Sequence, residues 1–177
     1  MLTLTLPGVA VTYYGEEIGM LNANITWEDT LDPSGCNCGI DHFNDKGCSR
    51  DPERTPMQWS HSKISAGFSS SNKTWLPVNP NYVTINVEDE RLDQSSHLEI
   101  YKKMAQLRYS YPAYASGDLQ MAEHNDTLAL IRGHSMLTII SFNEDQDSFA
   151  DFSGDFGSIQ GKVFLSTLGE NTTNSVG

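Results

Sequence analysis

The sequence lacks long hydrophobic runs, and it is poor in basic residues. No stretch is long and apolar enough to cross a bilayer as a helix. Lysine and arginine together number 11, against 23 aspartates and glutamates, so the formal net charge at pH 7 is −12. Because binding to phosphate backbones requires a basic surface, nucleic acid is not an expected partner. The acidic residues are scattered along the chain, which is typical of a solvated protein surface.

The chain also lacks the motifs of several catalytic mechanisms. It contains no Gly-rich phosphate loop, no Gly-x-Ser-x-Gly elbow and no His-Glu-x-x-His metal motif. Glu16 and Glu17 are adjacent, and on an extended backbone they would point to opposite faces, where they could not both flank one bond. Asp51 and Glu53 each have an arginine nearby in sequence that is expected to neutralise them. The residues by themselves therefore provide no complete catalytic set, and no cofactor is expected.

Three cysteines, Cys36, Cys38 and Cys48, lie close together. A disulfide between Cys48 and either Cys36 or Cys38 would close a short loop and leave one cysteine free or paired outside this chain. The competing interpretation is a zinc site formed by the three cysteines and His42. An oxidising compartment favours the disulfide, and no metal is then expected.

Four Asn-x-Ser/Thr sequons occur in polar or turn-like surroundings, at Asn24, Asn72, Asn125 and Asn171. One sequon often arises by chance, whereas four in a chain of 177 residues favour passage through the secretory pathway. The protein is therefore expected to be secreted or to lie on the extracellular face of a membrane, with these asparagines as candidate glycosylation sites.

The most unusual segment is residues 50–59, which contains two arginines, two acids, two prolines and a tryptophan. Pro52 and Pro56 each remove a backbone donor and push the preceding residue towards an extended conformation, so the segment is a poor helix and a poor strand. Arginine and tryptophan are well suited to hold a sugar or a carboxylate. The alternative is a structural loop held together by ion pairs.

The first half of the chain predicts one strand, one long loop and one helix. Residues 9–14 are a continuous β-branched and aromatic run, which predicts a strand buried on both faces, as in a parallel sheet. Residues 20–94 have no sustained period, and connections of that length are usually functional. A brief strand is predicted within them at residues 82–87. Ser96 with Glu99 forms a capping box that predicts a helix ending at Pro112.

After Pro112 the pattern changes to short strands, so a domain boundary is predicted near residues 113–117. Five runs are candidate strands, the first three joined by hairpin-type connections: residues 118–122, 127–132, 136–142, 148–152 and 161–166.

Three segments carry a family resemblance: residues 7–20 (PGVAVTYYGEEIGM), residues 50–59 (RDPERTPMQW) and residues 66–82 (AGF through WLPVNPNY). In this order and at this spacing they resemble α-glucosidases of glycoside hydrolase family 13, in the maltase and oligo-1,6-glucosidase branch. The cysteine and sequon pattern resembles that of an arthropod maltase. The similarity spans roughly residues 5–110, and the remainder matches the family only as a β-rich C-terminal domain.

The resemblance implies an α/β plus all-β fold. Residues 1–112 would be the C-terminal part of a catalytic (β/α)8 TIM barrel with a long substrate-side loop, and would include its last strand and closing helix. Residues 113–177 would be an incomplete antiparallel β C-terminal domain. The chain is thus expected to be truncated at both ends, and its partner would be the upstream part of the same polypeptide.

The resemblance also implies an activity. Family members cleave α-glucosidic bonds with retention, using carboxylates on barrel strands that would precede Met1, so no catalytic residue is assigned to this chain and the isolated chain is expected to be inactive. Arg50 corresponds to an arginine that helps form the subsite for the terminal glucose of maltose, sucrose or a short oligosaccharide, paired there with an aspartate from an early loop. Arg54 is expected to brace the loop.

A second interpretation is the matching region of a non-catalytic relative. The glucosidase-like heavy chains of amino-acid transporters share this region and act as partner proteins. Arg50 favours the enzyme, because a subsite arginine is dispensable where no substrate binds.

Overall fold

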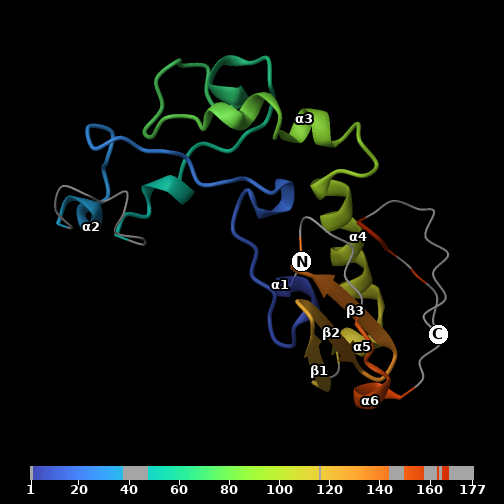
Figure 1. Cartoon of the computed structure of the whole chain (residues 1–177). Coiled ribbons are helices and arrows are strands. Elements are labelled where there is room, and N and C mark those ends of the chain that lie inside the picture. The colour runs from blue at the N-terminus through green and yellow to red at the C-terminus, as the bar shows by residue number, and fades with distance from the viewer. Residues whose placement is uncertain are drawn as a thin grey trace. The chain divides into compact units, whose positions relative to one another are not determined.

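A computed structural model describes residues 2–37, 48–115, 117–143, 150–157, 163 and 165–167 (Figure 1). The contacts divide the chain into two compact units. The loop unit is Tyr13–Glu99, and the sheet unit combines Met1–Thr12 with Ile100–Gly177. The sheet unit therefore brings residues from both ends of the sequence together.

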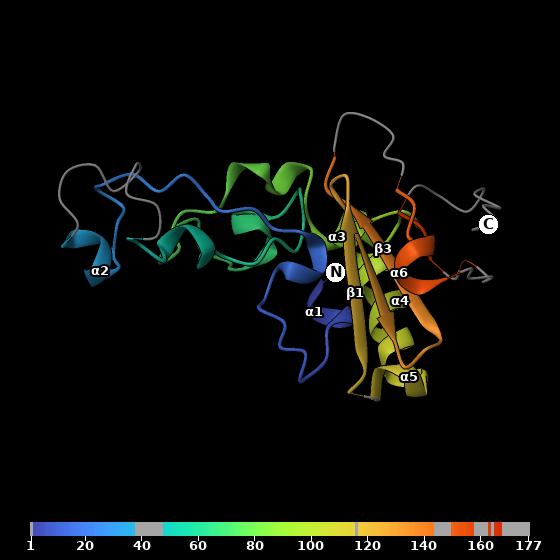
Figure 2. The ribbon, with the colours of Figure 1, turned by 60° about the horizontal axis from the view of Figure 1, so that its bottom comes forward.

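The sheet unit contains a three-stranded antiparallel sheet in the order β1-β2-β3 (Figure 2). Its strands are β1 Leu119–His124, β2 Thr127–Arg132 and β3 Met136–Ser141. The three strands predicted for this part of the sequence are confirmed, apart from small shifts at their ends. The central strand β2 is the most buried of the three, and Ala129 and Leu130 have no exposed surface. Its apolar composition follows from that position.

Both hairpin turns depend on residues that tolerate positive φ. Asn125 and Asp126, between β1 and β2, have φ of 46° and 59°, as in a two-residue type I′ turn. Gly133, between β2 and β3, has φ 53°, and a Cβ there would lie 2.7 Å from the Cα of Ala113. Glycine is therefore required at this turn by backbone conformation and by space.

The helix predicted from the capping box is α4, His97–Ser110. Ser96 precedes it, and its Oγ accepts a hydrogen bond from the backbone N–H of Glu99 at 3.2 Å. The predicted start of the helix is thereby confirmed. Pro112 does end α4, but it also begins the short helix α5, Pro112–Ala115.

The end of α4 and helix α5 pack against the sheet (Figures 1 and 2). The cluster consists of Ala113, Tyr114 and Met136, with Leu107 and Tyr111 packed around it. Burial of these apolar side chains holds α4 and α5 against strand β3.

The N-terminal helix α1, Leu2–Thr5, is held by an arginine far along the sequence. Arg108 of α4 donates hydrogen bonds to the carbonyl oxygens of Leu4 and Leu6, at 2.8 and 2.9 Å, and also to that of Gly8. The last carbonyl groups of a helix have no partner within the helix, so a cation that donates to them stabilises its end.

Arg132 of β2 performs the same task in a buried position. It is 1% exposed and donates to the carbonyl oxygens of Thr5 at 2.9 Å, Asp118 at 3.0 Å and Tyr114 at 3.1 Å. Its guanidinium therefore links α1, α5 and the start of β1. Buried carbonyl groups need donors, which explains an arginine inside the sheet unit.

Replacement of Arg132 by methionine should leave these carbonyl groups without donors, and we expect the free energy of unfolding to fall by about 3 kcal/mol. Denaturant unfolding followed by circular dichroism measures this change. Arg108→Met is the matched control, for which a smaller loss is expected because its bonds to Leu6 and Gly8 are exposed. An equal or smaller loss for Arg132→Met would contradict the buried role.

Residues 9–14, predicted as a strand buried on both faces, are not a strand. They form no ladder with any described residue, and Val9 and Val11 are 91% and 73% exposed. A parallel strand obtains its hydrogen bonds and its burial from neighbouring strands. The described part of the chain supplies no such neighbours, so the prediction is wrong for this structure.

The loop unit is built from short helical segments and turns. They are the 3-10 segments Glu16–Ile18, Asp51–Glu53, Ile64–Gly67 and Pro80–Val83, and the short helices α2 Pro33–Cys36 and α3 Val87–Glu90. Four buried side chains from widely separated positions form its core: Ile18, Met57, Val87 and Leu98.

The brief strand predicted at residues 82–87 is also wrong, because two asparagines cap helical segments on either side. Asn79 Oδ1 accepts from the Asn81 N–H at 3.3 Å, and Asn86 Oδ1 accepts from the Asp89 N–H at 2.9 Å. These caps favour the 3-10 segment Pro80–Val83 and helix α3 over an extended conformation.

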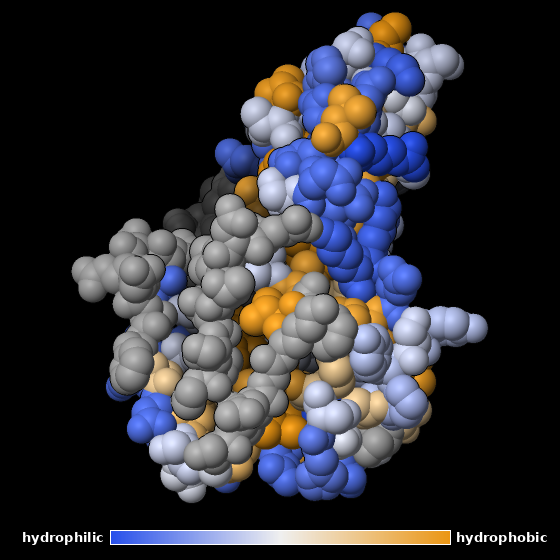
Figure 3. Space-filling model, turned by 90° about the vertical axis from the view of Figure 1, so that its right-hand side faces the viewer, coloured by the Kyte–Doolittle hydropathy of each residue, from blue (hydrophilic) through white to orange (hydrophobic). Residues whose placement is uncertain are grey.

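The last two candidate strands fall partly outside the described residues. Of residues 148–152, the described residues 150–152 are not in a strand and lead into helix α6, Ser153–Phe156. Of residues 161–166, the described residues 163, 165 and 166 are not in a strand either. In the described ranges no helix is long and apolar enough to span a membrane. Hydrophilic residues, in blue, cover much of the upper part of the face in Figure 3.

Candidate functional site

Arg50, the substrate-binding residue predicted from the sequence, forms an ion pair with Asp32 inside the loop unit. Arg50 Nε donates to Asp32 Oδ2 at 2.9 Å and Arg50 Nη2 donates to Asp32 Oδ1 at 3.0 Å, which is a bidentate arrangement. The Asp32 side chain is 0% exposed, whereas that of Arg50 is 52% exposed. One edge of the guanidinium is therefore fixed by protein, and the rest of the side chain remains open to solvent.

Asp51 makes a reciprocal contact. Its Oδ2 accepts hydrogen bonds from the backbone N–H groups of Leu31 at 2.6 Å and Asp32 at 2.7 Å. Backbone amides, and not the arginine expected from the sequence, thus satisfy this buried carboxylate. Leu31 and Asp32 on one segment and Arg50 and Asp51 on the other hold each other through two carboxylates. We call these four residues the carboxylate clasp.

Helix α2 supports the clasp. Asp32 is its N-cap, and Asp32 Oδ1 accepts from the Ser34 N–H at 3.1 Å. Gly35 lies against the chain just before Arg50, where an added Cβ would be 2.9 Å from the Cβ of Ser49. Only glycine allows this approach without displacement of one segment. Neither Asp32 nor Gly35 was predicted as a site residue from the sequence, although the Asp-Pro pair at the start of α2 is a signal for a helix N-terminus at Asp32.

The surroundings of Asp32 lower its pKa, and those of Tyr14 raise its pKa. Hydrogen bonds from the Arg50 side chain hold the pKa of Asp32 well below its ordinary value, and the same contact raises the pKa of Arg50. The Tyr14 hydroxyl donates to the carbonyl oxygen of Thr55 at 2.9 Å, and burial, followed by the effect of Tyr13, raises the pKa of Tyr14 to about 12. At neutral pH Asp32 is therefore an anion and Tyr14 a neutral donor.

Residues 55–58 of the 50–59 segment are buried, whereas Trp59 is 46% exposed. Thr55 and Gln58 have no exposed surface and Met57 is 6% exposed. Gln58 Nε2 donates to Asn81 Oδ1 at 3.0 Å and to the Ile85 carbonyl oxygen at 2.6 Å. These contacts anchor the segment that carries Arg50 to the rest of the loop unit.

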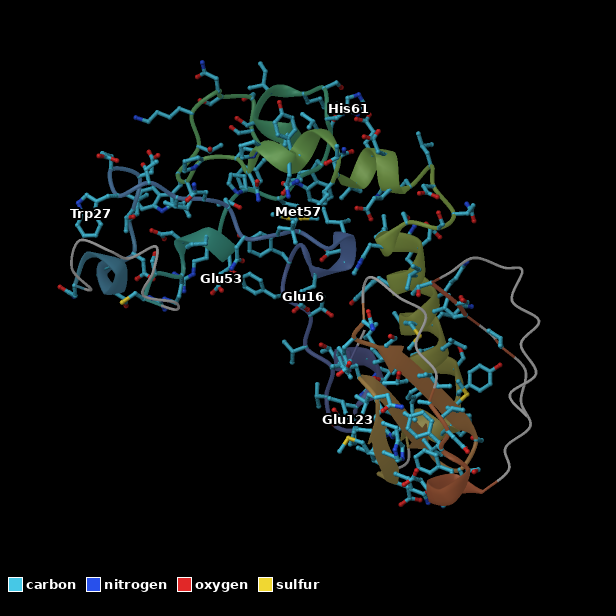
Figure 4. The ribbon with its side chains drawn as sticks, in the orientation of Figure 1. Glu16, Trp27, Glu53, Met57, His61 and Glu123 are labelled. Carbon is cyan, nitrogen blue, oxygen red and sulfur yellow. The ribbon has the colours of Figure 1, made fainter. Side chains whose placement is uncertain are left out.

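Arg54 does not brace the loop. Its side chain is exposed and, within the described part of the chain, makes no hydrogen bond or ion pair, and its backbone N–H donates only to the Asp51 carbonyl oxygen of the same turn, at 3.0 Å. The prediction for Arg54 is therefore wrong, and Asp32 with Asp51 does the bracing instead. Glu53 is likewise exposed on the turn that follows Arg50, and Trp27, 43% exposed, lies at the outer edge of the segment that leads to α2 (Figure 4).

Glu16 and Glu17 lie in the 3-10 segment Glu16–Ile18 and not on an extended backbone. Glu16 Oε2 accepts from the Tyr13 N–H at 3.1 Å. Glu17 Oε2 is buried and has no hydrogen-bond partner among the described residues. Neither glutamate contributes to the clasp.

Cys48 is disulfide-bonded in the structure. Cys38 and His42 lie outside the described residues, as does the side chain of Cys36, so the pairing stays a prediction. Among the residues that the structure describes, no group of three or more His, Cys, Asp or Glu could hold a metal ion.

Three of the four sequon asparagines, Asn24, Asn72 and Asn125, are exposed. Asn171 lies outside the described residues. The exposed positions offer space for a glycan, which a buried asparagine would not.

The sequence model of the family defined by the alpha-amylase catalytic domain matches residues 1–117 of this chain. The chain therefore belongs to this family, glycoside hydrolase family 13. Within the family it is similar to the alpha-glucosidase of Apis mellifera, at 45% identity over 151 residues, which are 82% of this chain and 26% of that protein. It is also similar to a salivary alpha-glucosidase of Aedes aegypti, at 45% identity over 72% of this chain and 21% of that protein. The chain thus spans about a quarter of the length of the relatives it matches.

Solved structures agree with this assignment. The trehalulose synthase MutB of Pseudomonas mesoacidophila MX-45 is 30% identical, with a TM-score of 0.68 over 80% of this chain and 28% of that one. These structural neighbours are TIM-barrel enzymes of the same family. A weaker similarity, 39% identity over 60% of this chain and 13% of the other, links it to the amino acid transporter heavy chain SLC3A1 of Mus musculus.

The lowered pKa of Asp32 predicts how the clasp responds to acid. Because its folded-state pKa lies below the ordinary aspartate value of 3.8, the stabilisation is fully present above that value and is lost as the pH falls through the folded pKa. We expect the unfolding free energies of wild type and Asp32→Asn to differ by a constant amount from about pH 7 to about pH 5, and the difference to shrink only in stronger acid.

Denaturant titrations at each pH measure this difference. Asp29→Asn, which changes an exposed aspartate in the same segment, is the control and should leave the unfolding free energy nearly unchanged at neutral pH. A gap that already closes on going from pH 7 to pH 5 would contradict the prediction.

Proposed function

We propose that the protein is a retaining α-glucosidase that releases terminal α-linked glucose from maltose, sucrose or short oligosaccharides, and that this chain is its C-terminal portion. The observation that carries the proposal is the state of Arg50. Its guanidinium is oriented by Asp32, yet its side chain is 52% exposed. The exposed part of the guanidinium is therefore accessible to a ligand.

The chemistry of the guanidinium suits a sugar hydroxyl. Arginine presents N–H donors in a rigid plane, and Asp32 engages Nε and one N–H of Nη2. Among the described residues, Nη1 and the second N–H of Nη2 have no acceptor. They are the donors with which Arg50 would bind the early-loop aspartate that the resemblance implies and the hydroxyl groups of a terminal glucose.

The division of labour follows from the residues present. Retention requires a carboxylate nucleophile and a carboxylic acid about 5 Å apart. In this proposal the upstream polypeptide supplies these groups, residues 1–112 complete the barrel and contribute the Arg50 subsite, and residues 113–177 form the β domain. Residues 9–14, exposed in the present chain, would then obtain strand partners from the upstream part.

A heavy-chain type of partner protein is the second candidate, because of the similarity to the mouse transporter subunit. The unengaged donors of Arg50 favour the enzyme, since a partner protein has no sugar to bind. The sequence upstream of Met1 decides between them: three barrel carboxylates identify an enzyme, and their replacement together with a membrane-spanning helix identifies an accessory subunit.

Arg50→Ala in the full-length protein should lower kcat/KM for maltose about ten- to a hundredfold, because charged hydrogen bonds to substrate are lost. Steady-state kinetics with the purified protein measure the effect. Arg54→Ala, which changes an exposed arginine outside the clasp, is the control and should retain wild-type kinetics. Equal losses of kcat/KM in both variants would count against a subsite role.

The isolated 177-residue chain should show no maltase turnover, because no complete catalytic set is present in its sequence. The assay is glucose release from maltose by purified material, with the full-length protein as the positive control. Sustained turnover by the isolated chain would contradict the proposed division of labour.

We further propose that the protein is secreted or faces the outside of a membrane, in line with the salivary origin of one relative. In that environment Cys48 pairs with Cys36 or Cys38. Glycans on Asn24, Asn72 and Asn125 would project from exposed positions, and Asn171 is a further candidate.

Glycan release by an N-glycosidase in heavy-oxygen water should label these asparagines, because the enzyme converts an occupied asparagine to aspartate. Peptide mass spectrometry of protein secreted from insect cells measures the label, and Asn81, which is not in a sequon, is the internal control. Absence of label at all four sequons would contradict the secretory assignment.

A further inference from the structure

We infer that Asp32 is the positioning residue that sets the direction of the Arg50 guanidinium for substrate, an inference that rests on the proposed α-glucosidase function. Every carboxylate oxygen of Asp32 is engaged by fixed donors of this chain. Asp32 itself is fully buried and would not touch the sugar. Its effect on substrate would pass entirely through Arg50.

The hydrogen bonds close the Arg50 side chain into a ring. The backbone N–H of Arg50 and its Nε both donate to Asp32 Oδ2, each at 2.9 Å. Because two ends of one side chain bind a single oxygen, the aliphatic stem between them is held in one conformation. The adjacent bond from Nη2 to Oδ1, at 3.0 Å, fixes the plane of the guanidinium.

The Arg50 side chain is held in this conformation before any substrate binds. A free arginine side chain samples many rotamers. A ligand that binds it restricts these rotamers, and the conformational entropy that is lost reduces the affinity. When the protein has already ordered the side chain, the cost no longer reduces affinity, which is the general advantage of preorganisation. The unengaged donors on Nη1 and Nη2 then keep a constant direction with respect to the loop unit.

Asp32 can hold Arg50 only because Asp32 is itself fixed. Asp51 Oδ2 binds the Leu31 and Asp32 amides, and Asp32 Oδ1 binds the amide of Ser34 at the start of α2. The close approach at Gly35 brings α2 against Ser49, next to Arg50. These contacts give the carboxylate a defined position relative to the arginine that it orients.

Capping of α2 does not by itself explain the aspartate. A cap needs one acceptor oxygen, and asparagine serves at this position as well as aspartate does. Orientation of Arg50 needs two acceptor oxygens and a negative charge, which asparagine lacks because its amide nitrogen is a donor. Asp32→Asn therefore retains the cap of α2 and removes the bidentate contact to Arg50.

The test is a double-mutant cycle in the full-length protein: wild type, Asp32→Asn, Arg50→Ala and the double variant. Each is assayed for kcat and KM with maltose and for melting temperature. We expect Asp32→Asn to raise KM about tenfold, with a much smaller change in kcat, because the oriented contact to the terminal glucose is lost. In the Arg50→Ala background the same substitution should have no further effect on KM.

Asp29→Asn is the matched control, since it changes an aspartate three residues away whose side chain contacts Thr26 and not Arg50. It should retain wild-type KM. If Asp32→Asn is not secreted, Asp32→Glu takes its place in the cycle. Glutamate keeps the charge but displaces the carboxylate by one methylene, so a rise in KM that depends on Arg50 is again expected.

Two results would overturn the inference. Unchanged KM in the Asp32 variant, with Arg50→Ala impaired, would show that Arg50 binds substrate without being positioned by Asp32, and the proposed function would survive. Additive losses in the double variant would show that Asp32 acts independently of Arg50, with the same consequence. Wild-type kinetics for Arg50→Ala would instead remove the Arg50 subsite, and the inference with it.

Discussion

The carboxylate clasp is the interaction on which the candidate site depends. Asp32 and Asp51 are both buried, and a buried carboxylate is costly unless donors surround it. The protein meets this requirement reciprocally: Asp32 is satisfied by Arg50 and the start of α2, and Asp51 by the backbone of Leu31 and Asp32. A segment with little regular secondary structure thereby acquires one defined conformation, with one half-exposed cation on its surface.

The sheet unit uses arginine for a related purpose. Arg108 and Arg132 donate to backbone carbonyl groups of the N-terminal segment. In both units, therefore, hydrogen bonds to charged side chains connect segments distant in sequence. The chain covers about a quarter of its relatives' length.

The predictions that depended on local patterns were confirmed. The capping box at Ser96 needs only its own helix, and the hairpin turn at Asn125 and Asp126 needs only residues that tolerate positive φ. The predictions that failed required knowledge of neighbours. Residues 9–14 have the composition of a buried strand, but no strand lies beside them in the described structure. Residues 82–87 have β-branched side chains, but asparagine caps impose helical turns on either side.

The sequence by itself determined the family, through motifs that are contiguous in the chain, and it indicated Arg50 as the candidate substrate-binding residue. It could not determine which acid would pair with that arginine. Asp51 is adjacent and Asp32 lies 18 positions away, yet the distant carboxylate receives the guanidinium, because α2 and Gly35 bring it within reach. Arg132 likewise meets Thr5 across 127 positions. Charge pairing is decided by distance in space, and only the tertiary structure sets those distances.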